Sequence, residues 1–196
     1  MRFQSAAALP ALMLLWVGLP STAVAQERAG FWISGGLRLK SVGGSIDGVS
    51  IDRGGAGDIT ISLGWTLTPQ LLIGVEASGY GVTLYNPAGV ETAGTNSVVS
   101  ITYYPRRSSG FFVRGGVGPT FLDNSEESPP AADISGKGIS VMGGAGYDFY
   151  LGRNFSLTSA VDYWYGDVGN VEFDQSTRFT DWKHNAIGVL FGIKFN

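Results

Sequence analysis

The sequence predicts an all-β protein, an up-and-down antiparallel barrel of eight strands, and three observations lead to this fold class. Large apolar residues recur at alternate positions over eight segments, which is the period of a strand with one apolar face. Every charged residue within those segments, apart from Lys183 at the start of the last one, falls on the other set of positions. The links between segments alternate between long and short, as expected when consecutive strands form hairpins in one barrel.

The eight predicted strands cover most of the chain after residue 30. In the second strand, Ile59, Ile61 and Leu63 alternate with Thr60 and Ser62. The apolar positions carry odd numbers in all eight segments. The predicted strands are 31–41, 56–68, 71–84, 95–104, 110–121, 138–151, 155–166 and 183–196.

The charged residues of the predicted strands give an independent test, because the faces were assigned from apolar residues alone. Apart from Lys183, the first residue of the last segment, all have even numbers, and these eight are predicted to form a charge network inside the barrel: Arg38, Lys40, Asp58, Glu76, Arg114, Asp148, Asp162 and Lys194. An unpaired charge in a narrow, poorly hydrated interior is costly. We therefore expect ion pairs, among them Lys40 with Asp58 and Glu76 with Arg114.

The alternation also fits a soluble sandwich or a lipocalin, but other features favour a transmembrane barrel. The predicted strands are about 10 to 14 residues long, which exceeds the usual length in soluble sheets and suits a tilted membrane-spanning strand. The polar face is rich in Gly, Ser and Thr, as in a narrow, filled interior. Long links (42–55, 85–94, 122–137 and 167–182) lie at one end, and short turns (69–70, 105–109 and 152–154) lie at the other.

Aromatic residues gather at both ends of the predicted strands, as they do at the two interfaces of a membrane. One group lies near the long links and includes Phe121, Tyr163 and Tyr165. The other forms a predicted girdle at the short turns: Trp32, Tyr103, Tyr104, Phe111, Phe149, Phe155 and Phe195.

Residues 1–25 are predicted to be a cleavable signal peptide, and residues 26–196 a single barrel domain. Arg2 precedes an apolar run, and Ala23-Val24-Ala25 supplies the small residues of a cleavage site before Gln26. The apolar run is too short for a membrane helix. The chain contains no cysteine, so neither a lipid anchor on cysteine nor a disulfide is expected.

Four stretches carry a resemblance to a known family: LLIGVEASGY (71–80), GFFVRGGVGPTF (110–121), GGAGYDFYL (143–151) and the terminal AIGVLFGIKFN. On these the chain resembles the small bacterial outer-membrane barrels of the OmpA-transmembrane and OmpX type. The resemblance implies a monomer in the outer membrane, with periplasmic termini and contacts to outer-membrane lipid and lipopolysaccharide. It also implies recognition of the last strand by the barrel-assembly machinery, although the aromatic Phe195 is penultimate and the chain ends in Asn196.

The expected function is a structural surface barrel that acts in envelope integrity or adhesion through its extracellular loops, with no catalytic activity and no cofactor. One alternative is a lipid A-modifying enzyme, which needs a histidine beside a serine or carboxylates. His184 is the one histidine, with Asp181 nearby and no serine within seven residues. We therefore expect it to be a surface-exposed residue at the membrane interface.

A narrow pore or a conduit for hydrophobic ligands is the other alternative. Eight strands enclose an interior that side chains just fill, and the inward set here is bulky, so an open channel is not expected. The oxygen-rich segments 45–52 and 123–127 could bind calcium, but they lack a fixed ligand spacing, and no metal site is predicted. A net charge of −3 without a basic patch excludes nucleic acid as a partner.

Overall fold

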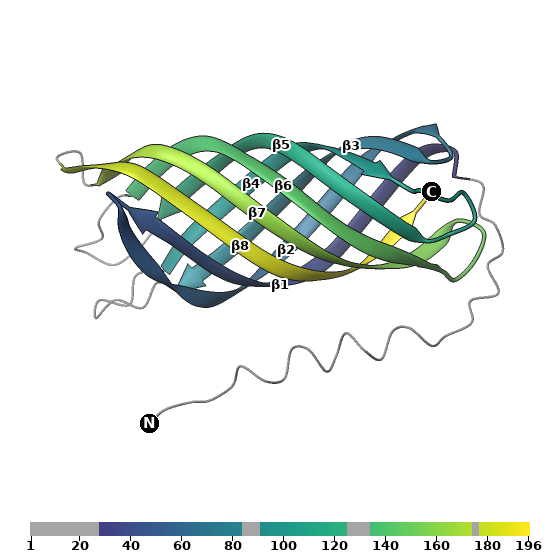
Figure 1. Cartoon of the computed structure of the whole chain (residues 1–196), viewed down its shortest axis with the longest axis horizontal. Helices are drawn as coiled ribbons and strands as arrows, with labels where there is room; N and C mark the ends of the chain where they lie inside the picture. Colours follow the sequence, from purple (N-terminus) through teal and green to yellow (C-terminus); the bar gives the residue numbers. More distant parts are fainter. Residues whose placement is uncertain (1–27, 84–90, 125–133, 174–176) are drawn as a thin grey trace, which may run out of the picture.

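The computed structural model is a closed barrel of eight antiparallel strands in chain order, which confirms the predicted fold class (Figure 1). The structure describes residues 28–83, 91–124, 134–173 and 177–196, so the predicted signal peptide lies outside the described residues. The strands are β1 Gly30–Ile46, β2 Val49–Thr68, β3 Leu71–Thr83, β4 Glu91–Tyr103, β5 Phe111–Asn124, β6 Ile134–Tyr150, β7 Phe155–Phe173 and β8 Thr177–Phe195.

The first and last strands close the barrel. Their register runs from Ile33 opposite Phe195 to Ser45 opposite Lys183. In lipid, each backbone N–H and C=O needs a partner inside the protein, so a sheet that crosses a membrane cannot leave an open edge there. The described residues include no helix that is long and apolar enough to cross a membrane.

The two faces of the sheet follow the predicted parity. Among the described residues, every buried apolar, polar or charged side chain has an even number, and every exposed large hydrophobic side chain has an odd number. On β1, for example, Leu37 is 63% exposed while the adjacent Arg38 is 0% exposed. The barrel is therefore apolar outside and polar inside, which is the arrangement required in lipid.

The predicted long links at 42–55 and 167–182 are wrong over most of their length. Strand β1 continues to Ile46 and β2 begins at Val49, so only Asp47 and Gly48 form the turn. Both have positive φ, at 50° and 79°, as a two-residue hairpin turn of type I′ requires. The register of β1 and β2 shifts between Val42 and Gly44, so beyond it even-numbered residues of β1 pair with odd-numbered residues of β2 and the common parity is lost.

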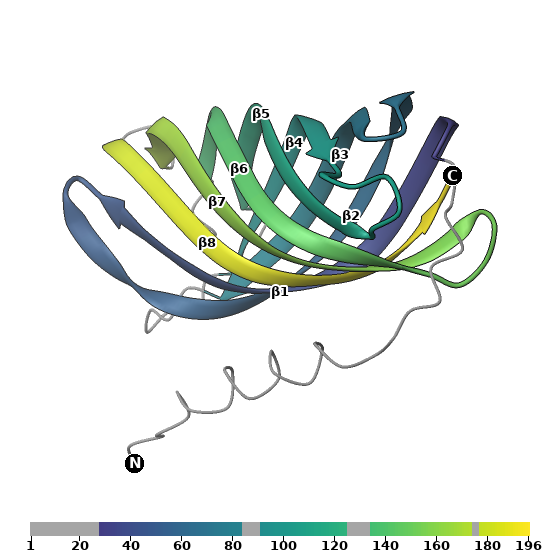
Figure 2. The same cartoon turned by 45° about the vertical axis from the view of Figure 1, so that its right-hand side comes forward.

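The barrel wall is consequently taller on one side than on the other (Figures 1 and 2). Strands β1, β2, β6, β7 and β8 have 17 to 20 residues, whereas β3, β4 and β5 have 13 or 14. A tilted strand needs about 9–11 residues to cross the membrane, so the longer strands continue well beyond it. The C-terminus lies at the opposite end, with the short turns.

Candidate functional site

Six of the predicted charged residues meet in the middle of the barrel, where five strands position them. We call this group the central cluster: Arg38 and Lys40 on β1, Asp58 on β2, Glu76 on β3, Arg114 on β5 and Asp162 on β7. Each has an even number and faces inward because successive side chains of a strand point to opposite faces. The cluster contains three bases and three acids, so its formal charge is zero.

Arg38 lies at the centre of this cluster. Its Nη1 donates to Asp58 Oδ2 at 3.1 Å, and its Nη2 donates to Glu76 Oε1 at 2.7 Å. Its Nε lies 3.2 Å from Asp162 Oδ2. The planar guanidinium can engage several carboxylates at once, and here it joins three strands to β1.

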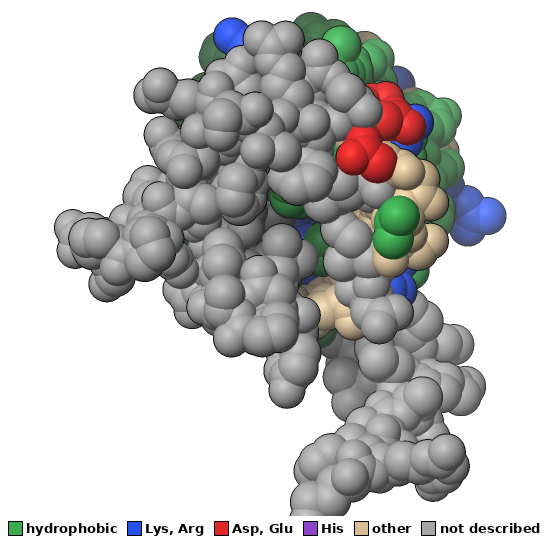
Figure 3. Space-filling model, turned by 90° about the vertical axis from the view of Figure 1, so that its left-hand side faces the viewer, with side chains coloured by type: hydrophobic (Ala, Val, Ile, Leu, Met, Phe, Trp, Pro, Cys, Tyr) green, Lys and Arg blue, Asp and Glu red, His purple; other side chains and the backbone are tan. Residues whose placement is uncertain are grey.

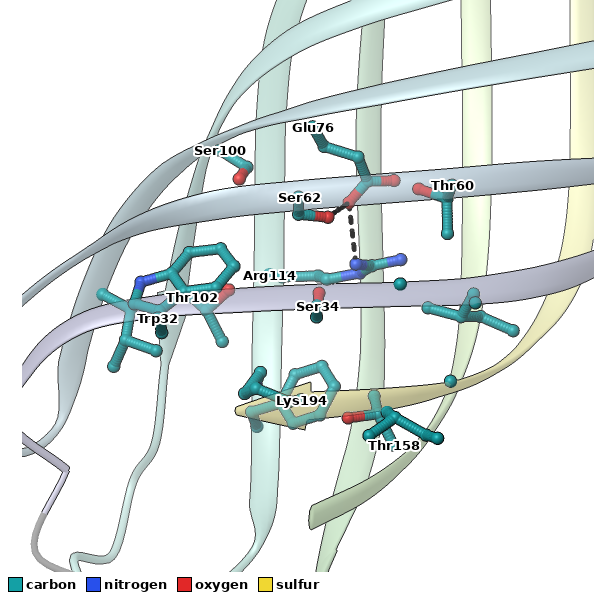
Figure 4. Close-up of a pocket in the computed structure, with 17 residues that line it drawn as sticks. Trp32, Ser34, Thr60, Ser62, Glu76, Ser100, Thr102, Arg114, Thr158 and Lys194 are labelled. Atoms are coloured by element: carbon teal, nitrogen blue, oxygen red, sulfur yellow. Dashed lines mark hydrogen bonds and ion pairs between the residues drawn. The ribbon is translucent and has the colours of Figure 1, made fainter. Parts of the chain in front are cut away.

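Arg114 contacts two of the same carboxylates from the other side. Its Nη1 donates to Glu76 Oε2 at 3.0 Å (Figure 4), and its Nε donates to Asp162 Oδ1 at 2.8 Å. Nη2 also pairs with Asp162, and Lys40 pairs with Asp58. The pairs that the sequence predicts, Lys40 with Asp58 and Glu76 with Arg114, are therefore both present.

The other two predicted charges lie nearer the short turns, in a group that we call the turn-side cluster: Arg28, Tyr104, Asp148, Tyr150, Thr158 and Lys194. Lys194 Nζ donates to Asp148 Oδ2 at 2.8 Å and to the Tyr104 hydroxyl at 2.7 Å. Tyr104 and Thr158 donate their hydroxyls to Asp148 at 2.5 Å and 2.6 Å. The Asp148 carboxylate thus has three donors, of which only one is charged.

Arg28 is a member of this cluster that sequence reasoning missed. It precedes β1 and donates to the carbonyl oxygens of Pro69, Arg107 and Ser109 at 3.2, 3.3 and 2.7 Å, and to the Tyr150 hydroxyl. Its guanidinium lies 3.5 Å from the centre of the Tyr104 ring, a cation–π contact. Arg28 therefore covers the short-turn end of the interior. It lies outside the alternating segments, so its even number was the only sequence feature that indicated an inward side chain.

The predicted aromatic girdle divides into outward and inward members. Tyr103, Phe111, Phe155 and Phe195 are exposed on the outer face, and Phe149 is half-buried and packs against Tyr147 with ring centres 4.7 Å apart.

Placing Trp32 and Tyr104 in the girdle was wrong. They are 4% and 0% exposed and lie inside the barrel with Leu72, Phe112 and Leu190. Their even numbers already favour the interior, whereas the girdle had been assigned from position along the strand alone.

Apolar layers and a small polar cavity fill the remaining interior. Val98, Met142, Trp164 and Ala186 form a second apolar group. A cavity of about 30 Å³ lies between the central cluster and Lys194 and is lined by both, together with Ser and Thr hydroxyls and Trp32 (Figure 4). A single water needs about 10–15 Å³ of such volume, so the space suits one or two water molecules.

His184 is not the exposed interfacial residue that the sequence suggested. It lies on β8, is 7% exposed and faces the interior of the barrel. Its backbone partners are Gly44 of β1 and Gly166 of β7. A side chain at Gly166 would collide with its ring. Within the described ranges, no group of three or more His, Cys, Asp or Glu residues is placed to hold a metal ion.

A closed barrel with an apolar outer face and a filled, charged interior belongs to the class of small transmembrane β-barrels. The chain is a member of the outer membrane protein β-barrel domain family, whose family model matches residues 9–195. This places it in the bacterial outer membrane. No curated protein matches the chain.

Several solved structures share the fold. Neisserial surface protein A is 15% identical, with a TM-score of 0.57 over 85% of this chain and 97% of that one. OprG from Pseudomonas aeruginosa is 16% identical, with a TM-score of 0.50 over 88% and 99%. Ail from Yersinia pestis is 12% identical, with a TM-score of 0.50 over 86% and 99%. At these identities the likeness concerns the fold alone.

Proposed function

We propose that the protein is a non-conducting, non-catalytic surface barrel that acts in envelope integrity or adhesion through its extracellular end. The observation that carries this proposal is the filled interior, with the central cluster and the turn-side cluster on either side of a cavity of about 30 Å³. A pore or a ligand conduit needs a continuous opening. Moving the central cluster aside would strand buried charges, which is strongly unfavourable.

The position of His184 supports a role without catalysis. A lipid-modifying enzyme would present its catalytic residues to the outer face or to an open rim, because its substrate lies in the surrounding membrane. His184 faces the interior of the barrel instead, and its ring lies against Gly166 of the neighbouring strand β7. No cofactor or metal is part of the proposed function.

We propose that the long hairpins face the cell exterior and that both termini are periplasmic. The tall wall formed by the long strands β6, β7, β8, β1 and β2 then stands above the outer leaflet as the surface for contacts. Neisserial surface protein A and the attachment invasion locus protein Ail, which share the fold, are surface and attachment proteins by name.

The proposed orientation also assigns the partners of the barrel. The odd-numbered face contacts outer-membrane lipid and lipopolysaccharide, and the barrel-assembly machinery recognises β8. We also propose that the barrel is a monomer, because a closed sheet has no open edge that a second copy must cover.

Single-channel recording in planar bilayers tests the closed interior. We expect no steady conductance from the wild-type protein. A stable open state would overturn the proposal in favour of a pore.

The lipid A mass spectrum of a deletion strain tests the absence of catalysis. It should match that of the parent, and a specific change in acylation or phosphorylation would favour an enzyme.

Epitope insertion tests the orientation in the same strain. A tag placed in the Asp47-Gly48 turn should be accessible to antibody on intact cells. A tag between Arg106 and Arg107 should be accessible only after the outer membrane is permeabilised. The reverse pattern would invert the proposed topology.

A further inference from the structure

Arg53 lies flat across the outer face of the wall, at the end with the long hairpins. Its Nε donates to Ser41 Oγ at 3.1 Å, and its Nη2 donates to the Ser41 carbonyl oxygen at 2.7 Å. Its Nη1 donates to Asn185 Oδ1 at 2.6 Å. The side chain therefore starts on β2, crosses β1 and reaches β8, and all of these residues have outward-facing odd numbers.

A glycine on β1 makes this crossing possible. Gly43 pairs with Asn185 of β8 and lies beneath the Arg53 side chain. A Cβ at position 43 would stand 2.9 Å from Arg53 Cγ and 3.3 Å from Nη1, so an alanine there would push the arginine away from the sheet. Gly43 thus forms a notch in which the guanidinium is held.

The charge of Arg53 is fixed in place but not neutralised. Its three acceptors are a hydroxyl, a carbonyl and an amide, all uncharged, and no ion pair among the described residues includes it. A guanidinium has five N–H groups, so two remain for a ligand. Because Arg53 is exposed and already ordered, an anion would bind with a small entropic cost.

The notch lies near an outward aromatic residue of this end, Tyr165. Asn185 pairs with Tyr165 of β7, a partly exposed aromatic residue, and such residues sit at the level of lipid headgroups. Lys183 lies two residues from Asn185 on the same face and adds a second base, which is paired with Asp181. Figure 3 views this end and shows basic and acidic side chains at the described margin of the barrel.

We propose that Arg53, held over Gly43, binds a phosphate group of an outer-leaflet glycolipid. Arginine recognises phosphate through paired N–H donors, and phosphorylated glycolipid headgroups are the anions present at this level of the outer leaflet. The identification of the leaflet rests on the orientation proposed above. The anion-binding chemistry of the notch does not rest on that orientation, because it depends only on the geometry of Arg53.

Lipid retention by the full barrel in detergent micelles tests this site independently of orientation, because both ends are accessible there. Purified protein is mixed with bisphosphorylated lipid A or with chemically dephosphorylated lipid A, and the bound lipid is counted by native mass spectrometry. We expect Arg53→Gln to reduce retention of the phosphorylated form about fivefold, as loss of a charge-assisted contact predicts. Arg106→Gln, which removes an exposed base at the other end, should leave retention unchanged.

A second pair of variants separates the built notch from simple surface charge. Gly43→Ala keeps Arg53 but displaces it, and should lose retention as Arg53→Gln does. Gly54→Ala, where an added Cβ meets nothing within 4 Å, should bind as the wild type does. Equal retention of both lipid A forms, or equal loss with Arg106→Gln, would overturn the proposal. Binding of inorganic phosphate without retention of phosphorylated lipid A would also overturn it, because the site would then bind a free anion and not a lipid.

Discussion

The central cluster and the turn-side cluster both bury charge, but they compensate it differently. In the central cluster, Arg38 and Arg114 are held by the carboxylates of Asp58, Glu76 and Asp162. In the turn-side cluster, Arg28 is held by three carbonyls and two aromatic rings. Removing one member of a buried ion pair leaves its partner as an uncompensated charge, which is strongly destabilising. Removing a base that is held only by neutral groups leaves no charge behind and is expected to cost less.

The largest effect is therefore expected in the central cluster. Arg114→Met should lower the free energy of unfolding by about 3–5 kcal/mol, because it leaves Glu76 and Asp162 short of a buried partner. Urea unfolding in lipid vesicles measures this loss. The double variant with Glu76→Gln should cost less than the sum of the single losses, with a coupling of about 1–3 kcal/mol. Strict additivity would mean that the two side chains do not interact.

Lys194→Met is expected to have an intermediate effect. It removes the cation paired with Asp148, but the hydroxyls of Tyr104 and Thr158 still donate to that carboxylate. We expect a loss of about 2–3 kcal/mol in the same assay, since a hydrogen bond to a charged group is replaced only in part. A loss as large as that of Arg114→Met would remove the distinction between the clusters.

Arg28→Gln should cost less again, about 1–2 kcal/mol, because every group it leaves behind is neutral. The informative measurement is proteolysis or hydrogen exchange at the short-turn end. There the residues 105–110 should become more accessible, while the central strands keep their protection. Uniform loosening of the whole barrel would show that Arg28 stabilises more than this end.

Tyr104→Phe is expected to have the smallest effect, at about 1 kcal/mol, because the two charged groups that its hydroxyl bonds, Lys194 and Asp148, still pair directly at 2.8 Å. It keeps the ring beneath Arg28 and removes only the hydroxyl between Lys194 and Asp148. Thermal unfolding followed by heat-modifiable gel migration would detect the shift. Tyr103→Phe, on the exposed outer face, is the matched control and should leave the transition in place.

Sequence periodicity was sufficient for the wall but not for its ends. Alternation within a spanning strand is imposed by lipid on one side and a filled interior on the other, so the parity of Leu37 and Arg38 could be predicted. Beyond the membrane this constraint disappears, and the Asp47-Gly48 turn was hidden within a supposed loop although the Asp-Gly pair is itself a hairpin signal.

Contacts between distant residues were harder to predict than faces. The charge pairs of the interior followed from parity and neutrality, because few partners fit inside so small a barrel. Arg28 reaches carbonyls 41 to 81 residues away, and Arg53 depends on Gly43 and Asn185, which no local pattern links. His184 was wrongly expected at the surface because its possible catalytic role was considered first, whereas its even number already indicated the interior.

The seam between β1 and β8 also determines when the interior can form. Arg38 and Asp162 pair across that seam, and they are brought together only when the last strand meets the first. Before this moment Arg38 can pair with Asp58 and Glu76, and Asp162 can pair with Arg114, but the ring of ion pairs stays open between Arg38 and Asp162. Closure of the barrel thus completes the ring of ion pairs, and the long sequence separation of Arg38 and Asp162 leads us to expect that this contact forms slowly. The Arg38–Asp162 ion pair therefore stabilises the closed barrel and not intermediates in which the seam is open.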